Sequence, residues 1–182
     1  MKYKSSIMNE DDVKRALIRL SHQIIEKNRG TNGLCLIGIR SRGVPIAKRI
    51  EEYIKSIEGV EVPTGELDIT LYRDDLSKIS QDPVLNKTNI PFDVEGKTVV
   101  LVDDVIFTGR TARAAMEAVI KQGRPARIQL AVLIDRGHTE LPIKADFVGK
   151  NIPTSMQEIV AVRLREYDNT ETGVTIWGKT AD

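Results

Sequence analysis

Cysteine is scarce in this sequence, and neither sign of charge predominates. The 182 residues include a single cysteine, Cys35, so no disulfide can form within the chain, which suits a reducing compartment. Cys35 stands inside the apolar run 34–39, where a small buried side chain is a more common role than a nucleophile. The 27 Lys and Arg residues are matched by 26 Asp and Glu residues, leaving a formal net charge of +1. This balance excludes a molecule that nucleic acid or anionic lipid attracts as a whole, so such a partner would need a local patch.

Long apolar runs and several common functional motifs are also missing. Residues 1–10 contain no apolar segment that could act as a signal peptide, and no apolar run approaches the roughly 20 residues of a membrane helix. We therefore expect a cytoplasmic protein without a membrane partner. The chain lacks the P-loop motif, the dinucleotide glycine motif, the metal-ligand spacings of Cys and His, and the G-x-S-x-G nucleophile motif. We predict no metal held directly by the protein.

Hydrophobic periodicity predicts alternating strands and helices in one domain, residues 1–182. Helices are expected from the Asn9 cap to near Gly30, over 44–57 and over 109–122; strands are expected over 34–39, 67–72, 98–102 and 128–134. Shorter β-like runs follow at 147–148, 159–164 and 174–177. This order is typical of an α/β fold with a mostly parallel central sheet flanked by helices. The polar stretch 73–95 is too long for an ordinary connection and predicts a mobile lid.

The most informative segment is 99–111, VVLVDDVIFTGRT. A buried strand brings two adjacent carboxylates, Asp103 and Asp104, to its carboxyl end, and a short turn then opens a helix. Backbone N–H groups at the start of that helix attract a phosphate, and Gly109 allows the phosphate to come close. Carboxylates for vicinal hydroxyls beside amides for a phosphate indicate a phosphorylated sugar. A plain helix cap with solvated acids would explain Thr108, but not two anions at the end of a buried strand.

Residues 99–111 resemble the phosphoribosyl-pyrophosphate (PRPP) binding motif of type I phosphoribosyltransferases. The segments 38–43, 68–76, 135–138 and 149–155 are further similar to the family of bifunctional pyrimidine operon regulators and uracil phosphoribosyltransferases, and the resemblance spans about residues 7–165. It implies a type I phosphoribosyltransferase fold with a mobile lid at about 72–95. It also implies a small base-binding hood, built from the terminal segments and about 136–158.

The resemblance implies the reaction of uracil with PRPP to give UMP and diphosphate, with Mg²⁺ bound together with PRPP. Hypoxanthine and guanine enzymes carry a carboxylate where this chain has Phe107, which cannot transfer a proton, so a pyrimidine is favoured. The implied catalytic residues are Asp103, Asp104, Tyr72 and Arg73, the last two closing over the diphosphate. The implied PRPP-binding residues are Arg40, Ser41, Arg42, Gly43, Asp103, Asp104, Val105, Ile106, Phe107, Thr108, Gly109, Arg110 and Thr111. Arg136 and His138 would border the base.

A basic stripe lies beside the apolar face of the first predicted helix. For an isolated helix this would be read as a solvated face. By resemblance it belongs to a concave surface of a homodimer, or of a tetramer, that binds pyrimidine operon leader mRNA under the control of UMP and other uridine nucleotides. The implied RNA-binding residues are Arg15, Arg19, His22, Lys27, Lys144 and Lys150. Departures from the family are Ile18, Thr139 and Lys144, where relatives commonly carry Thr, Arg and Arg; Lys keeps the charge but loses the planar fork of Arg.

Three functions agree with these residues. The first, which we expect, is an active uracil phosphoribosyltransferase that also regulates transcription through RNA, without binding DNA. The second is an RNA-binding regulator that keeps the PRPP fold only as a nucleotide sensor. The third is a salvage phosphoribosyltransferase for another base.

Overall fold

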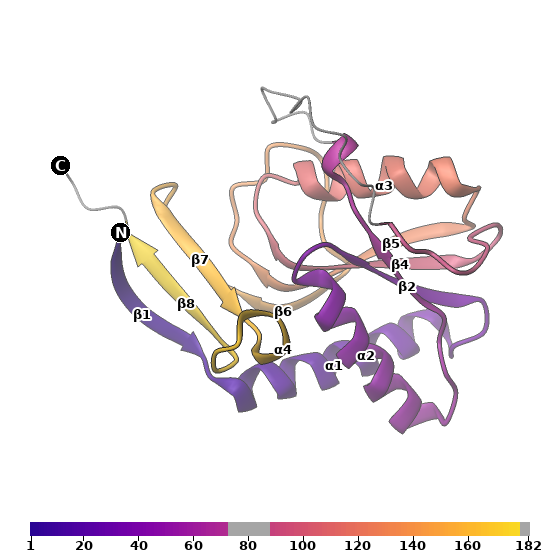
Figure 1. Cartoon of the computed structure of the whole chain (residues 1–182), viewed down its shortest axis with the longest axis horizontal. Helices are drawn as coiled ribbons and strands as arrows, with labels where there is room; N and C mark the ends of the chain where they lie inside the picture. Colours follow the sequence, from indigo (N-terminus) through magenta and orange to yellow (C-terminus); the bar gives the residue numbers. More distant parts are fainter. Residues whose placement is uncertain (73–87, 179–182) are drawn as a thin grey trace.

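The computed structural model describes residues 1–72 and 88–178, and its centre is a five-stranded parallel sheet (Figure 1). The strands run in the spatial order β3 (Thr64–Leu67), β2 (Leu34–Ile39), β4 (Thr98–Ile106), β5 (Arg127–Asp135) and β6 (Phe147–Asn151). All four neighbouring pairs are parallel, so the carboxyl ends of the strands share one edge of the sheet. That edge is where open α/β sheets bind their ligands.

Helices cover both faces of this sheet. Helices α1 (Glu10–Asn28) and α2 (Gly43–Glu58) lie on one face, and α3 (Arg110–Gln122) lies on the other (Figure 1). Along β4, Val100 and Val102 pack into the cluster that contains the apolar side chains of α1 and α2, whereas Val99 and Leu101 pack with the alanines of α3. Because both faces are buried, β2 and β4 appear in the sequence as continuous apolar runs rather than as alternating patterns.

A second, antiparallel sheet joins the two ends of the described chain. Its order is β1 (Lys2–Met8), β8 (Gly173–Gly178) and β7 (Glu158–Arg163), and the short helix α4 (Arg165–Asp168) lies between β7 and β8. Lys2 is paired with Gly178. The three strands lie beyond one end of the parallel sheet (Figure 1). The division into a core domain, a lid and a base-binding hood stays a prediction.

The sequence predictions of α1, α2, α3, β2 and β5 are confirmed. Asn9 caps α1 as expected: its side chain accepts the Asp12 N–H while the Asp12 side chain accepts the Asn9 N–H. The strand predicted over 67–72 is wrong, because β3 ends at Leu67 and a 3-10 turn, η1, spans Thr70–Tyr72. The Asp68 carboxylate accepts the Thr70 N–H at 3.0 Å and the Thr70 hydroxyl at 2.6 Å, and this local pairing replaces a strand ladder.

The predicted lid is described only at its two ends, since Arg73 and the rest of 73–87 lie outside the described residues. At the second end, Asn89 and Glu66 exchange two backbone hydrogen bonds of 2.8 Å, which attaches this segment to β3. Val94 is buried against the α3 side of the sheet. Among the helices of the described residues, none is long and apolar enough to cross a membrane.

Candidate active site

The two adjacent carboxylates lie within the last part of β4, which extends past the predicted end at Val102. Asp103 is still in register with Val132 of β5. Its carboxylate accepts the Asp104 N–H, and the Asp104 carboxylate accepts the Val105 N–H, both at 2.9 Å. Burial raises the pKa of Asp104 above its ordinary value, although the hydrogen bond with Asp103 and the positive charge of Arg42 act in the opposite direction. The site therefore holds a carboxylate whose ionisation the fold opposes.

A turn leads from β4 into α3 and forms the floor of a hollow of about 350 Å³. Gly109 caps the helix with φ of 90°, a conformation that favours glycine. The N-terminus of α3, with its positive dipole end, opens at this hollow, where the Arg110 N–H donates to the Thr108 hydroxyl at 3.3 Å. The hollow is lined by the predicted PRPP-binding residues Asp103, Val105, Ile106, Phe107, Thr108, Gly109, Arg110 and Thr111, together with Ala112, Leu130, Val132 and Glu140.

The segment after β5 crosses this turn and is tied to it. The Glu140 N–H donates to the Thr108 carbonyl at 2.9 Å, and the Arg110 guanidinium donates to the Glu140 carboxylate at 3.1 Å. A Cβ at Gly109 would lie 3.6 Å from the side chains of Thr139 and Leu141. The residues predicted to hold the 5′-phosphate are thus enclosed from the side of the segment 139–143.

The loop Arg40–Gly43 leaves the end of β2 and lies directly against β4. A Cβ at Gly43 would come within 2.2 Å of the Val102 carbonyl oxygen, so only glycine allows this approach. The Arg40 N–H donates to the Leu67 carbonyl at 2.9 Å, its side chain pairs with Glu66, and the Arg40–Ser41 peptide bond is cis. The structure therefore brings the predicted diphosphate loop beside Asp103 and Asp104.

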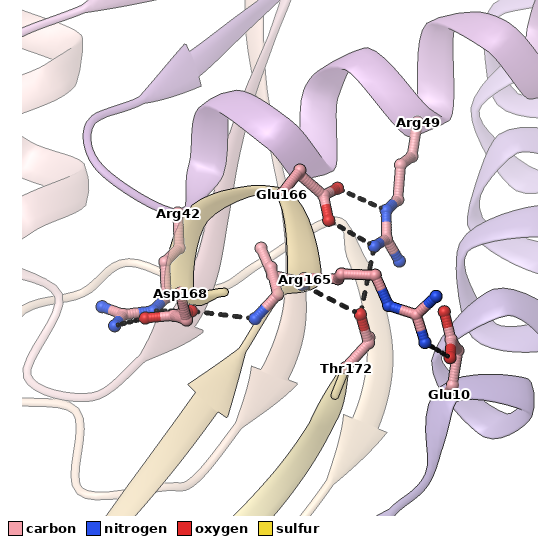
Figure 2. Close-up of polar contacts among 8 residues, drawn as sticks. Glu10, Arg42, Arg49, Arg165, Glu166, Asp168 and Thr172 are labelled. Atoms are coloured by element: carbon pink, nitrogen blue, oxygen red, sulfur yellow. Dashed lines mark hydrogen bonds and ion pairs between the residues drawn. The ribbon is translucent and has the colours of Figure 1, made fainter. Parts of the chain in front are cut away.

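Arg42 has a partner that the sequence did not suggest. Its guanidinium is hydrogen-bonded to the carboxylate of Asp168 on α4, with Nη2 to Oδ1 at 2.6 Å (Figure 2). Asp168 was not among the predicted site residues, and a separation of 126 positions in the sequence leaves no local signal of the pair.

Phe107, Arg136 and His138 lie together, and of the three Phe107 lines the hollow. The Arg136 guanidinium carbon lies 4.0 Å from the centre of the Phe107 ring, and the His138 ring meets that ring edge-on at 6.0 Å. Arg136 is only 6 % exposed and donates to the Thr154 hydroxyl at 3.1 Å and to the Ser155 carbonyl at 3.0 Å. Arg136 therefore braces the loop 154–155 as well as bordering the predicted base site, and sequence reasoning had given these two loop residues no role.

Tyr72 lies along α3 rather than at the diphosphate loop. Its ring centre is 4.6 Å from the Lys121 ammonium in the last turn of α3, and its carbonyl accepts from Arg113 at 2.8 Å. The phosphate turn is at the opposite end of the same helix. The closing role of Tyr72 stays a prediction, and its predicted partner Arg73 lies outside the described residues.

The predicted RNA-binding residues gather along α1 and the neighbouring edge strand β6. Arg19 donates to the Gly149 carbonyl, and the Lys27 ammonium lies 2.7 Å from the Asp146 carboxylate. Lys150 donates to the Ile7 carbonyl at 3.4 Å. The other three side chains, those of Arg15, His22 and Lys144, belong to exposed residues. Residues far apart in the sequence thus share one side of the molecule.

Comparison with known proteins identifies this architecture. The family model of the phosphoribosyl transferase domain matches residues 5–166. The chain is 58 % identical to the bifunctional protein PyrR of Thermus aquaticus over 98 % of both chains, and 62 % identical to PyrR of Caldicellulosiruptor bescii over 90 % of both. The chain belongs to the PyrR family. It is a phosphoribosyltransferase, and the family that residues 38–43, 68–76 and 99–111 predicted is confirmed.

Solved structures confirm the fold of this PyrR-family chain. A hypoxanthine phosphoribosyltransferase from Trypanosoma cruzi superposes with a TM-score of 0.73 at 17 % identity, covering 97 % of both chains. One from Staphylococcus aureus superposes with a TM-score of 0.72 at 18 % identity, covering 96 % of this chain and 91 % of the other. At such low identity the likeness concerns the fold, and it says nothing about which base is used.

Proposed function

We propose that this site transfers the phosphoribosyl group of PRPP to uracil, giving UMP and diphosphate. The observation that carries the proposal is that Asp103 and Asp104 lie at the end of β4, directly before the α3 phosphate turn, in a member of the PyrR family. The loop 40–43 packs against β4 beside them, through Gly43. The three elements offer carboxylates for the ribose hydroxyls, amides for the 5′-phosphate and cations for the diphosphate.

The carboxylates act mainly through charge. Glycosyl transfer from PRPP develops positive charge on the ribose as the diphosphate departs, and fixed anions stabilise that charge better than water does. Asp103 and Asp104 are already fixed by hydrogen bonds to their neighbouring backbone. Arg40 and Arg42 face the departing anion, so the positive and negative groups are separated along the bond that breaks.

Uracil is favoured over a purine by the chemistry of Phe107. This side chain offers an apolar face, already packed against Arg136 and His138, and no group that could exchange a proton with a purine. A small pyrimidine ring can stack in such surroundings and be read by backbone groups.

Magnesium would enter with PRPP. Within 1–72 and 88–178 there is no group of three or more His, Cys, Asp or Glu side chains that could hold a metal, so the protein alone supplies an incomplete ligand set. Asp103 and Asp104 offer hard oxygen atoms of the kind that Mg²⁺ prefers, and the phosphate oxygens of PRPP and water would complete the shell. The ion supplies charge neutralisation for the diphosphate.

The test of the enzyme is production of UMP from uracil and PRPP with Mg²⁺. We expect Asp104→Asn to lower kcat by about 10² to 10³-fold, because one charge that faces the transition state is lost. Glu52→Gln is the control: Glu52 is exposed on α2, outside both the site and the predicted lid, and turnover should stay near the parent value. Turnover of hypoxanthine or guanine without uracil would contradict the choice of base.

We further propose that the α1–β6 side binds pyrimidine operon leader mRNA, in response to UMP and other uridine nucleotides, through a concave surface formed by a homodimer. The supporting observation is the gathering of Arg19, Lys27 and Lys150 from two distant segments onto one side, as RNA phosphates require. No DNA or membrane partner is proposed, and we place the protein in the cytoplasm.

A gel-shift titration with the leader hairpin tests this second function. Arg19→Ala should weaken binding by about tenfold and flatten the salt dependence, because one phosphate contact is removed. Lys55→Ala removes a cation from α2, outside this surface, and should leave the affinity unchanged. Equal affinities of the two variants would contradict the assignment.

A further inference from the structure

The turn between β7 and β8 reaches over to the loop that we assign to the diphosphate. Asp168, at the end of α4, accepts two hydrogen bonds from Arg42, Nε to Oδ2 at 3.2 Å and Nη2 to Oδ1 at 2.6 Å (Figure 2). The guanidinium carbon also lies 5.3 Å from the centre of the Tyr167 ring. A carboxylate bound through two atoms fixes the plane and direction of a guanidinium as well as its position.

The turn that carries Asp168 is supported independently of Arg42. Arg49 of α2 makes two hydrogen bonds of 2.7 Å to the Glu166 carboxylate and a third, of 3.2 Å, to the Thr172 hydroxyl (Figure 2). The Leu164 N–H donates to Asp168 Oδ2 at 2.8 Å. Asp168 therefore meets Arg42 from a rigid support rather than from a loose loop.

Two carboxylates act on the one guanidinium. The hydrogen bonds that Arg42 donates to Asp168 raise the pKa of Arg42, and the charge of Asp104 raises it further. A guanidinium carries N–H groups on two edges of a planar fork. Asp168 occupies the Nε–Nη2 edge, and within the described part of the chain Nη1 donates to no acceptor. The Nη1 side of the fork is thus left for a second anion.

We propose that Asp168 is a positioning residue for the diphosphate of PRPP: it clamps one edge of Arg42 so that the other edge is presented to the diphosphate. This rests on the proposed function, because it assumes that the loop 40–43 receives the diphosphate. Asp168 lies in the C-terminal part of the chain, outside the two predicted PRPP-binding segments 40–43 and 103–111. The proposal therefore makes PRPP affinity depend on a residue outside those segments. A clamped guanidinium loses less side-chain freedom when the anion binds, so the expected gain is in affinity.

Asp168→Asn is the discriminating variant. The asparagine keeps the side-chain oxygen that accepts from the Leu164 N–H and from Arg42 Nε, but it puts an amide NH₂ where Oδ1 accepted from Arg42 Nη2. We expect the KM for PRPP and the inhibition constant of diphosphate each to rise about tenfold, with kcat and the KM for uracil changed less than twofold. Calorimetry of PRPP with Mg²⁺ should show the same loss of affinity without any turnover.

Glu166→Gln is the matched control, since it neutralises a carboxylate of the same turn whose partner, Arg49, lies outside the loop 40–43. The Leu164 N–H and the Arg49–Thr172 hydrogen bond still hold the turn in this variant, so its KM for PRPP should equal the parent value even if its melting temperature falls as far as that of Asp168→Asn. In an Arg42→Ala background, Asp168→Asn should cause no further rise. Equal PRPP affinities in Asp168→Asn and Glu166→Gln, or a full additional loss in the Arg42→Ala background, would overturn the proposal.

The same measurements separate this inference from the proposed function. A parent protein that binds PRPP but forms no UMP would overturn the proposed reaction, and the calorimetric comparison would still decide the role of Asp168. A parent that forms UMP, with both variants alike in PRPP affinity, would leave the reaction standing and remove Asp168 from it.

Discussion

At the scale of single residues, burial raises the pKa of both Cys35 and Asp104, but with different consequences for the two side chains. Cys35 is fully buried, as its place in an apolar run predicted, and burial raises its pKa to about 11, so it stays a neutral thiol in the core. Burial also raises the pKa of Asp104, but this side chain lies beside Arg42 and next to Asp103, which lines the hollow proposed to receive the sugar. A carboxylate that the fold alone disfavours is well suited to a ligand that neutralises it.

This conflict predicts that Asp104→Asn stabilises the protein while it inactivates the enzyme. A pKa above the ordinary value means that folding favours the protonated acid, so ionisation at neutral pH costs folding free energy. The neutral amide removes that cost and keeps an oxygen for the Val105 N–H. We expect a gain on the order of 1 kcal/mol at pH 7, measured by urea unfolding.

The gain should shrink as pH falls from the raised pKa of folded Asp104 toward the ordinary aspartate pKa of about 4. Below that value it should vanish, because Asp104 is then protonated in both the folded and the unfolded protein. Asp93→Asn serves as the comparison, since this exposed residue shows no such burial. An Asp104→Asn variant that is less stable than the parent at pH 7 would show that the carboxylate is held favourably, by Arg42 and Asp103, and not against the fold.

At the scale of elements, local sequence patterns were sufficient to predict a strand that is buried on both faces or a helix that carries its own cap. The strand β4 and the start of α3 were predicted together because the apolar run, the acidic pair and the glycine turn are consecutive in the sequence. The strand β1 was missed because only Met8 among its residues is buried, and its partner is β8 at the other end of the chain. Pairing between strands at the two ends of the chain produces no pattern within a short stretch of sequence.

The same distinction explains how much of the candidate site could be predicted. The residues predicted to contact the phosphate and the ribose are consecutive, so a motif of 13 positions, 99–111, contained them. Positioning contacts are made between elements: Asp168 reaches Arg42 from α4, and Thr154 reaches Arg136 from the segment before β7. Turn residues such as Asp168 and Thr154 are common in loops, so their composition alone gave no functional signal.

At the scale of the whole molecule, the net charge of +1 hides an uneven distribution of carboxylates. Three of them, on or beside β7 and α4, are bound to cations from distant elements: Glu158 to Lys4, Glu166 to Arg49 and Asp168 to Arg42. These pairs connect β1, α2 and the loop 40–43 to the C-terminal part of the chain. The Lys4–Glu158 pair lies within the antiparallel sheet, whereas the Arg49 and Arg42 pairs join α4 to α2 and to the loop 40–43 of the parallel sheet. Acid can break all three pairs.

Acid should weaken the protein through these three groups. Hydrogen bonds from Lys4 and the Ser155 N–H lower the pKa of Glu158; for Glu166 and Asp168, burial acts to raise the pKa, but the arginine partners and backbone N–H groups together lower it further. A lowered pKa stabilises the folded state above the ordinary carboxylate pKa of about 4, and this stabilisation is lost as pH falls toward the lowered values. Asp104 has a raised pKa, so its protonation at low pH favours the folded state, but it is a single group and the three carboxylates with lowered pKa outnumber it.

We therefore expect the melting temperature to fall by about 5 °C or more between pH 6 and pH 3.5, followed by circular dichroism at low salt. Glu166→Gln carries no charge to lose at this position, so it should start below the parent at pH 6 and show a smaller fall. If Glu166→Gln and the parent lose the same number of degrees, the Arg49–Glu166 pair contributes nothing to the acid response. The join between the two sheets would then depend on the apolar contacts of Val162, Leu164 and Val174 with the α1 and α2 core rather than on charge.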